Sequence, residues 1–168
     1  MVSTTRKIVL SALLCAITCV TTMVIKIPSP LKGYVNLGDC IVLLSAWVLP
    51  WGYAFLSAGI GSALADVVLG YVIYAPATFF IKGITALIAY FVFALLSKKT
   101  GRNWSQFLGG ILGEIFMVLG YFIFEGFLYG FIPSAVNILP NCVQGVAGIV
   151  IGICLIKIIE KTQVIANK

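Results

Sequence analysis

The stretch PATFFIKGITALIAYFVFALLS, from Pro76 to Ser97, decides the class of fold. Lys82 is its one charged residue, and the rest is almost entirely apolar. A run of about 20 apolar residues is long enough, as a helix, to cross the hydrocarbon core of a bilayer. The hydrophilic hexapeptide KKTGRN follows at once, at positions 98–103. The pattern therefore predicts a membrane-spanning helix that ends at this hexapeptide.

Similar apolar segments fill the chain on both sides of this stretch. We expect an all-α membrane protein with one integral membrane domain over 1–168, a bundle of six transmembrane helices at about 6–27, 37–50, 52–71, 76–97, 104–129 and 133–159. The second segment has only about 14 residues, or ~21 Å of helix. It is therefore expected to lie among its neighbours or to be bordered by thinned lipid.

The composition excludes a soluble protein. Of the 168 residues, 61% are hydrophobic and 10% are charged, whereas soluble domains carry about 25% charged residues. The first segment follows Arg6 and Lys7 but is about 20 residues long and lacks a cleavage site of small residues, so we expect a retained helix and not a signal peptide. No Gly-rich nucleotide-binding loop with a lysine is present in the sequence.

Basic residues predict the orientation. With the N-terminus inside, eight of them fall on the cytoplasmic side: Arg6, Lys7, Lys98, Lys99, Arg102, Lys157, Lys161 and Lys168. Only Lys26 and Lys32 fall outside. Since cytoplasmic loops carry the excess of Lys and Arg, both termini are expected in the cytoplasm.

Four ionisable residues lie within the expected spans: Asp66, Lys82, Glu114 and Glu125. Each costs about 2.5–3.5 kcal/mol at the centre of a membrane helix, so they are expected to face an interior cavity or to pair. Asp66 and Lys82 are expected at similar depths, which predicts a structural ion pair between them; the alternative is that Lys82 also donates to a ligand. Asp39 begins the second segment, where a carboxylate suits the helix dipole.

A stripe of amides marks the last segment. Asn137, Asn141 and Gln144 follow an i, i+4, i+7 spacing, which places them on one helix face. Such a stripe either bonds neighbouring helices or lines a solute cavity, and we favour the cavity. The expected pocket lies near the outer face and is formed by Tyr34, Asn36, Lys82, Glu125, Asn137, Asn141 and Gln144. Aromatic and amide groups together suit a small, flat, hydrogen-bonding solute.

Pairs of small residues recur at a spacing of four, at Ala12/Ala16, Ala54/Ala58, Gly109/Gly113 and Gly148/Gly152. Such pairs let membrane helices pack closely. The five cysteines form no Cys-x-x-Cys pair and the chain has no histidine, so we expect no metal site. Whether Cys40 and Cys142 approach each other is left open.

The segments YVNLGD (34–39), GIGSALAD (59–66), GYVIYAPAT (70–78) and IKG (81–83) resemble the second to fourth helices of the substrate-binding (S) components of energy-coupling factor (ECF) vitamin transporters. The resemblance implies a cell-membrane protein that works with a transmembrane coupling subunit and two ATPase subunits. It implies that Ala12 and Ala16 dock on the coupling subunit. It also implies that ATP is used by the partners, with no cofactor bound here.

The resemblance favours a pyridoxine-like or hydroxymethylpyrimidine-like substrate, with riboflavin next. The alternative is a self-sufficient, proton-coupled carrier of a small heteroaromatic solute, with Asp66, Glu114 and Glu125 as a proton relay. An enzyme is not expected, because the sequence shows no nucleophile–base arrangement and hence no catalytic residue.

Overall fold

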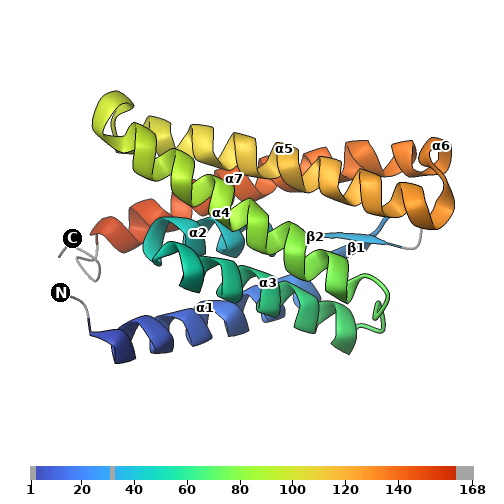
Figure 1. Ribbon diagram of the computed structural model, residues 1–168, viewed down its shortest axis with the longest axis horizontal. Coiled ribbons are helices and arrows are strands. Elements are labelled where there is room, and N and C mark those ends of the chain that lie inside the picture. The colour runs from blue at the N-terminus through green and yellow to red at the C-terminus, as the bar shows by residue number, and fades with distance from the viewer. Residues whose placement is uncertain (1–2, 31–32, 162–168) are drawn as a thin grey trace.

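The computed structural model describes residues 3–30 and 33–161, and it is a bundle of helices that lie roughly lengthwise beside one another (Figure 1). The long helices are α1 (Thr4–Val24), α3 (Trp51–Val68), α4 (Ala75–Thr100), α5 (Arg102–Tyr129) and α7 (Ile138–Lys161). The short elements are β1 (Lys26–Pro28), β2 (Tyr34–Asn36), α2 (Asp39–Val48), α6 (Phe131–Ser134) and the 3₁₀ turn η1 (Ala135–Asn137). Helix α1 begins and α7 ends at the same end of the bundle.

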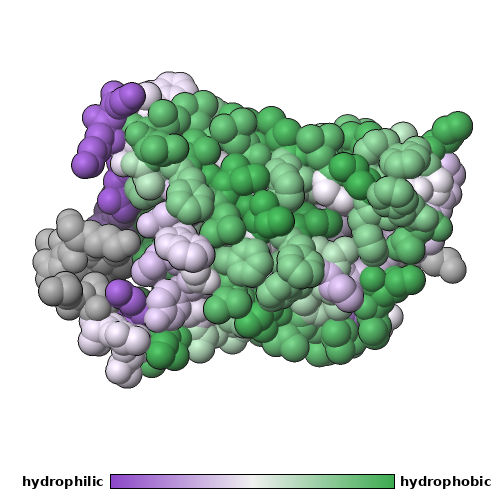
Figure 2. Space-filling model, viewed as in Figure 1, coloured by the Kyte–Doolittle hydropathy of each residue, from purple (hydrophilic) through white to green (hydrophobic). Residues whose placement is uncertain are grey.

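The sides of the bundle are apolar. Five helical segments in the described part of the chain are long and apolar enough to cross a membrane, with the run 131–161 counted as one. Figure 2 shows hydrophobic side chains along the length of the visible face, and the most hydrophilic ones at the end of the bundle that holds the α4–α5 turn and the start of α1. Large side chains such as Leu95, Phe127 and Leu139 are more than two-thirds exposed. A surface of this kind suits hydrocarbon, as the composition predicts.

Helix α2 lies in the centre of the bundle, and all ten of its residues are buried. It contacts α1, α3, α4 and α7. Of the two expectations for this short segment, burial among its neighbours is therefore the correct one. Ten residues of helix reach only ~15 Å. The chain reaches α2 from the hairpin, which lies towards the other end of the bundle (Figure 1). Since α2 itself is too short to span the bilayer, the expected number of six membrane crossings stays a prediction.

The chain between α1 and α2 was expected to be a loop, but it contains an antiparallel hairpin. Its strands pair Lys26 with Asn36, Ile27 with Val35 and Pro28 with Tyr34. A three-residue strand is too short to show the alternation that predicts a strand. The fold class is therefore all-α except for this small hairpin.

Two glycines in the left-handed region separate the last long helices. Gly101, at φ +81°, ends α4 before α5 begins, and Gly130, at φ +92°, ends α5. Only glycine adopts such angles without strain. The observed helix ends lie within a few residues of the expected ones, except that α6 and η1 turn the chain before α7 begins.

The Gly109/Gly113 pair packs α5 on α4. A Cβ on Gly109 would lie 2.8 Å from the carbonyl oxygen of Ala89, and one on Gly113 would lie 3.0 Å from that of Thr85. The two backbones therefore approach more closely than a side chain would allow, which is the packing role that the sequence suggested.

Three of the four small-residue pairs lie inside the bundle and one does not. Ala54 and Ala58 are fully buried in α3, and Gly148 packs on the first turn of α2. Ala12 and Ala16, by contrast, lie on an exposed face of α1. This pair therefore serves no packing inside the subunit.

Candidate binding pocket

A polar pocket lies under the hairpin, between α1, α3, α4, α5 and α7. All seven residues that the sequence assigned to a pocket line it: Tyr34, Asn36, Lys82, Glu125, Asn137, Asn141 and Gln144. Its free volume is only about 30 Å³. That is room for a few water molecules. A heteroaromatic solute therefore requires the hairpin or the helices to move apart.

Lys82, which lines the pocket, forms an ion pair with Asp39 of α2. Lys82 Nζ lies 2.5 Å from Asp39 Oδ1, and both side chains are almost fully buried. Gln144 Nε2 donates to the other Asp39 oxygen at 2.6 Å. Both carboxylate oxygens are thus satisfied, which offsets part of the cost of removing the ion pair from water.

The expected ion pair between Asp66 and Lys82 is wrong, because Lys82 pairs with Asp39. The prediction that Asp66 and Lys82 lie at similar depths agrees with the structure, since both line the same pocket. It carried no information on position across the bundle, where the central helix α2 brings Asp39 to the lysine. Asp39 stands in the first turn of α2, so it also suits the helix dipole as expected.

The hairpin is tied to the pocket at two points. The Tyr34 hydroxyl donates to Asp66 Oδ1 at 2.6 Å, and the Asn36 backbone N–H donates to Gln144 Oε1 at 2.8 Å. Burial, and then the neighbouring Asp66 carboxylate, raise the pKa of Tyr34 well above its ordinary value. The phenol is therefore a hydrogen-bond donor throughout the physiological pH range.

Asp66 has one open oxygen. The residue is 4% exposed, and its Oδ2 atom has no hydrogen-bond partner in the described part of the chain. The Thr78 hydroxyl is close to the carboxylate and is a neutral neighbour. A buried, unsatisfied carboxylate oxygen costs free energy, so its presence in a pocket indicates a place for a donor.

Two of the three amide side chains on this helix face form hydrogen bonds with other elements, and the third does not. Asn137 Nδ2 lies 3.0 and 2.9 Å from the two oxygens of Glu125, and Gln144 bonds to Asp39 and to the hairpin. For these two residues, bonding between elements is correct, although both also line the pocket. Asn141 is half-buried, and no hydrogen bond joins its side chain to the described residues. It lines the pocket without such a bond.

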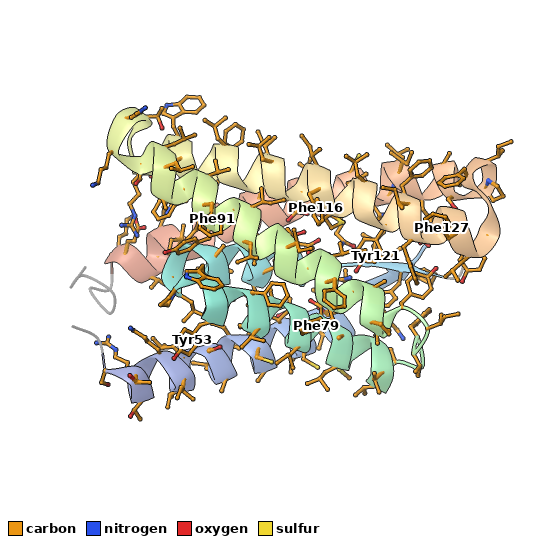
Figure 3. The ribbon with its side chains drawn as sticks, in the orientation of Figure 1. Tyr53, Phe79, Phe91, Phe116, Tyr121 and Phe127 are labelled. Carbon is orange, nitrogen blue, oxygen red and sulfur yellow. The ribbon has the colours of Figure 1, made fainter. Side chains whose placement is uncertain are left out.

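Three tyrosines that the sequence assignment did not include, Tyr71, Tyr74 and Tyr121, join Tyr34 in a wall of the pocket. The rings of Tyr34 and Tyr71 are 4.9 Å apart between centroids, and those of Tyr71 and Tyr74 are 6.3 Å apart. Lys82 Nζ lies 5.3 Å from the centroid of Tyr121, a residue labelled on α5 in Figure 3. Four of the seven tyrosines of the chain thus line one pocket. The Tyr-x-x-Tyr spacing at 71–74, next to Asp66, was the available signal.

Glu114 lies outside this pocket. The sequence placed it with Glu125 among the ionisable residues of the spans, but of these two carboxylates only Glu125 lines the pocket. Its side chain is 4% exposed and sits against Gly145 of α7, and neither carboxylate oxygen has a hydrogen-bond partner among the described residues.

Comparisons with known proteins agree on one family. The sequence profile described as "ECF-type riboflavin transporter, S component" matches residues 2–161. A relative from Pyrococcus woesei, described as "Uncharacterized protein in gap 3'region", is 40% identical over 134 residues, which are 79% of this chain and 87% of the relative. A solved structure described as "Structure and mechanism of the S component of a bacterial ECF transporter" superposes with a TM-score of 0.78. That match is 21% identical and covers 96% of this chain and 99% of the other, so the two share a fold.

Proposed function

The chain belongs to the ECF-type riboflavin transporter S component family, and from this premise we propose that it captures a small water-soluble vitamin at the outer face of the cell membrane. It is a multi-pass membrane protein with five apolar helices, and its family is a transporter component and not an enzyme. The observation that carries the proposal is the pocket: a tyrosine wall, an open amide and an open carboxylate oxygen meet inside a bundle with apolar sides.

The outward opening follows from charge. The described basic residues of the two termini and of the α4–α5 turn lie at the end where α1 begins, and the pocket lies under the hairpin towards the opposite end (Figure 1). Lys32 and Lys168 lie outside the described residues. With the basic end in the cytoplasm, the hairpin faces the exterior. A solute would then enter from outside.

The size of the pocket supports a one-ring substrate. A pyridoxine-like or hydroxymethylpyrimidine-like compound needs a smaller opening of a 30 Å³ cavity than the three-ring system of riboflavin does. Riboflavin, which the family description names, is the runner-up. In this proposal the solute contacts the seven residues that the sequence assigned to the pocket: Tyr34, Asn36, Lys82, Glu125, Asn137, Asn141 and Gln144.

The energy for uptake would come from partners. We expect a transmembrane coupling subunit and two ATPases that bind the ATP, with no cofactor on this chain. The exposed Ala12/Ala16 pair on α1 supports a docking surface, because close approach of another helix there needs small side chains.

The test is ligand-induced stabilisation of the detergent-purified chain. A ligand at 100 times its Kd adds about 2.7 kcal/mol to the stability of the folded state. We expect a vitamin from a broad panel to raise the melting temperature, and Asn141→Ala to weaken that rise. The absence of any shift across the panel, with no co-purified small molecule, would overturn the proposal.

Uptake into liposomes by the chain alone under a proton gradient would instead support a secondary carrier.

A further inference from the structure

Asp66 and Glu125 are the two carboxylates among the described residues that line the pocket. Among the described residues that line the pocket, Lys82 is the one basic side chain; its charge acts on Asp66 without direct contact, and its ion pair is with Asp39. Within 3–30 and 33–161, neither Asp66 nor Glu125 takes part in an ion pair. The pocket therefore carries two acidic groups beyond its internal ion pair.

The partners of these carboxylates are neutral donors. Asp66 accepts from the Tyr34 phenol and keeps Oδ2 open. Glu125 accepts from the amide of Asn137 and, at 3.4 Å, from the hydroxyl of Tyr74. A buried carboxylate that lacks a cation is costly in its charged form. A ligand that brings a positive charge, or N–H donors for the open oxygen, would lower this cost, whereas a ligand that offers neither would not.

The aromatic wall points to the same ligand chemistry. Tyr34 donates to Asp66 and its ring lies tilted against that of Tyr71, while the Tyr74 hydroxyl donates to Glu125, so each carboxylate has a tyrosine beside it. The face of an aromatic ring attracts cations, and a carboxylate forms charge-assisted hydrogen bonds of about twice the strength of neutral ones. Rings and acids together are the usual means of holding a flat cation.

We propose that this pocket selects a single-ring heterocycle that carries a positively charged or amidine-like group of N–H donors, which is placed against Oδ2 of Asp66 with its ring on the tyrosines. The proposal rests on the proposed function and narrows its substrate class. Asp66 is the residue that determines specificity, and Glu125 supplies the second negative charge.

The experiment measures dissociation constants for matched pairs of probes on the full purified chain. One pair is 4-amino-5-hydroxymethyl-2-methylpyrimidine and its 4-hydroxy counterpart, and the other is pyridoxamine and pyridoxine. Riboflavin is the neutral three-ring probe. We expect the amino member of at least one pair to bind about 10-fold more tightly or better.

Three variants test which carboxylate causes the preference for the amino member of each pair. Asp66→Asn should bring the ratio of dissociation constants close to one, and Glu125→Gln, the second variant in case Asp66→Asn does not fold, should lower it. Glu160→Gln makes the same exchange of carboxylate for amide at the Arg102 ion pair, far from the pocket, and should leave the ratio unchanged.

The outcomes separate the substrate class from the function. If both hydroxy members or riboflavin bind as tightly as the amino members, the substrate class is wrong and the vitamin-capturing function stands. If the folded Asp66→Asn protein keeps the preference, the assignment to Asp66 is wrong. If no probe and no other vitamin binds, this inference and the proposed function fail together.

Discussion

At the scale of single residues, the Lys82–Asp39 pair is the most consequential contact in the pocket. Lys82→Met leaves the Asp39 carboxylate buried without its cation, which should lower the stability by about 3–5 kcal/mol. The double variant Asp39→Asn/Lys82→Met removes both charges and should be more stable than Lys82→Met alone. Unfolding in detergent measures both. Strictly additive effects of the two substitutions would show that the pair is not coupled.

Tyr34 gives a prediction on pH. Because the pKa of Tyr34 is raised in the folded protein, the unfolded chain loses this proton first as the pH rises. The contribution of Tyr34 to stability should therefore be complete below pH ~10, the ordinary value for tyrosine, and fall above it. Unfolding of the native protein and of Tyr34→Phe from pH 7 to pH 11 measures this. The variant should lose less stability over that range; an equal loss would contradict the assignment.

The sequence predicted which residues meet better than it predicted how they pair. Helical periodicity placed Asn137, Asn141 and Gln144 on one face, and all three line the pocket. The Asp66–Lys82 pair was wrong because spacing along a helix gives depth in the bundle but not the neighbour across it. Tyr71 and Tyr74 were missed because they lie in a turn, where periodicity gives no direction.

At the scale of elements, the contact of α4 with α5 depends on glycine. Gly109→Ala would place a methyl group 2.8 Å from the Ala89 carbonyl oxygen and force the helices apart, so we expect a loss of about 1–3 kcal/mol. Gly52→Ala is the matched control, since nothing lies within 4 Å of its added Cβ. The control should be unchanged or slightly more stable, because alanine favours a helix. Equal melting temperatures for the two variants would contradict the packing.

Helices long enough to show an apolar run were predicted well from the sequence, and the short strands were not. The apolar runs located the five long helices to within a few residues, and the brevity of 37–50 gave burial among neighbours as one of two expectations, which α2 meets. The hairpin was missed because three residues per strand are too few for a pattern. Its position depends on tertiary bonds instead, from Tyr34 to Asp66 and from Asn36 to Gln144.

At the scale of the whole molecule, the exposed pair on α1 predicts a separation of binding from transport. Ala16→Leu adds bulk to the exposed face of α1 without touching the pocket. Vitamin binding by the isolated subunit should be unchanged, and uptake by cells that express the coupling subunit and the ATPases should fall at least 10-fold. Val150→Leu, at an exposed position of α7, should transport normally. Normal uptake by Ala16→Leu would show that this face is not the docking surface.

The membrane class could be read from composition alone, since 10% charged residues cannot cover a water-facing surface. The function could not be obtained in that way. It required the YVNLGD-to-IKG resemblance, and the family match over residues 2–161 confirms that resemblance. The identity of the vitamin depends on the side chains inside one pocket, which the family does not determine.

The central claim is that this pocket holds one small molecule, and native mass spectrometry of the purified chain tests it most directly. We expect the wild-type protein, saturated with the tightest-binding vitamin of the panel, to carry one bound molecule per chain. Under the same conditions Asn141→Ala should carry clearly less. A wild-type spectrum that shows only the bare mass with every vitamin, or equal occupancy in Asn141→Ala, would contradict the account.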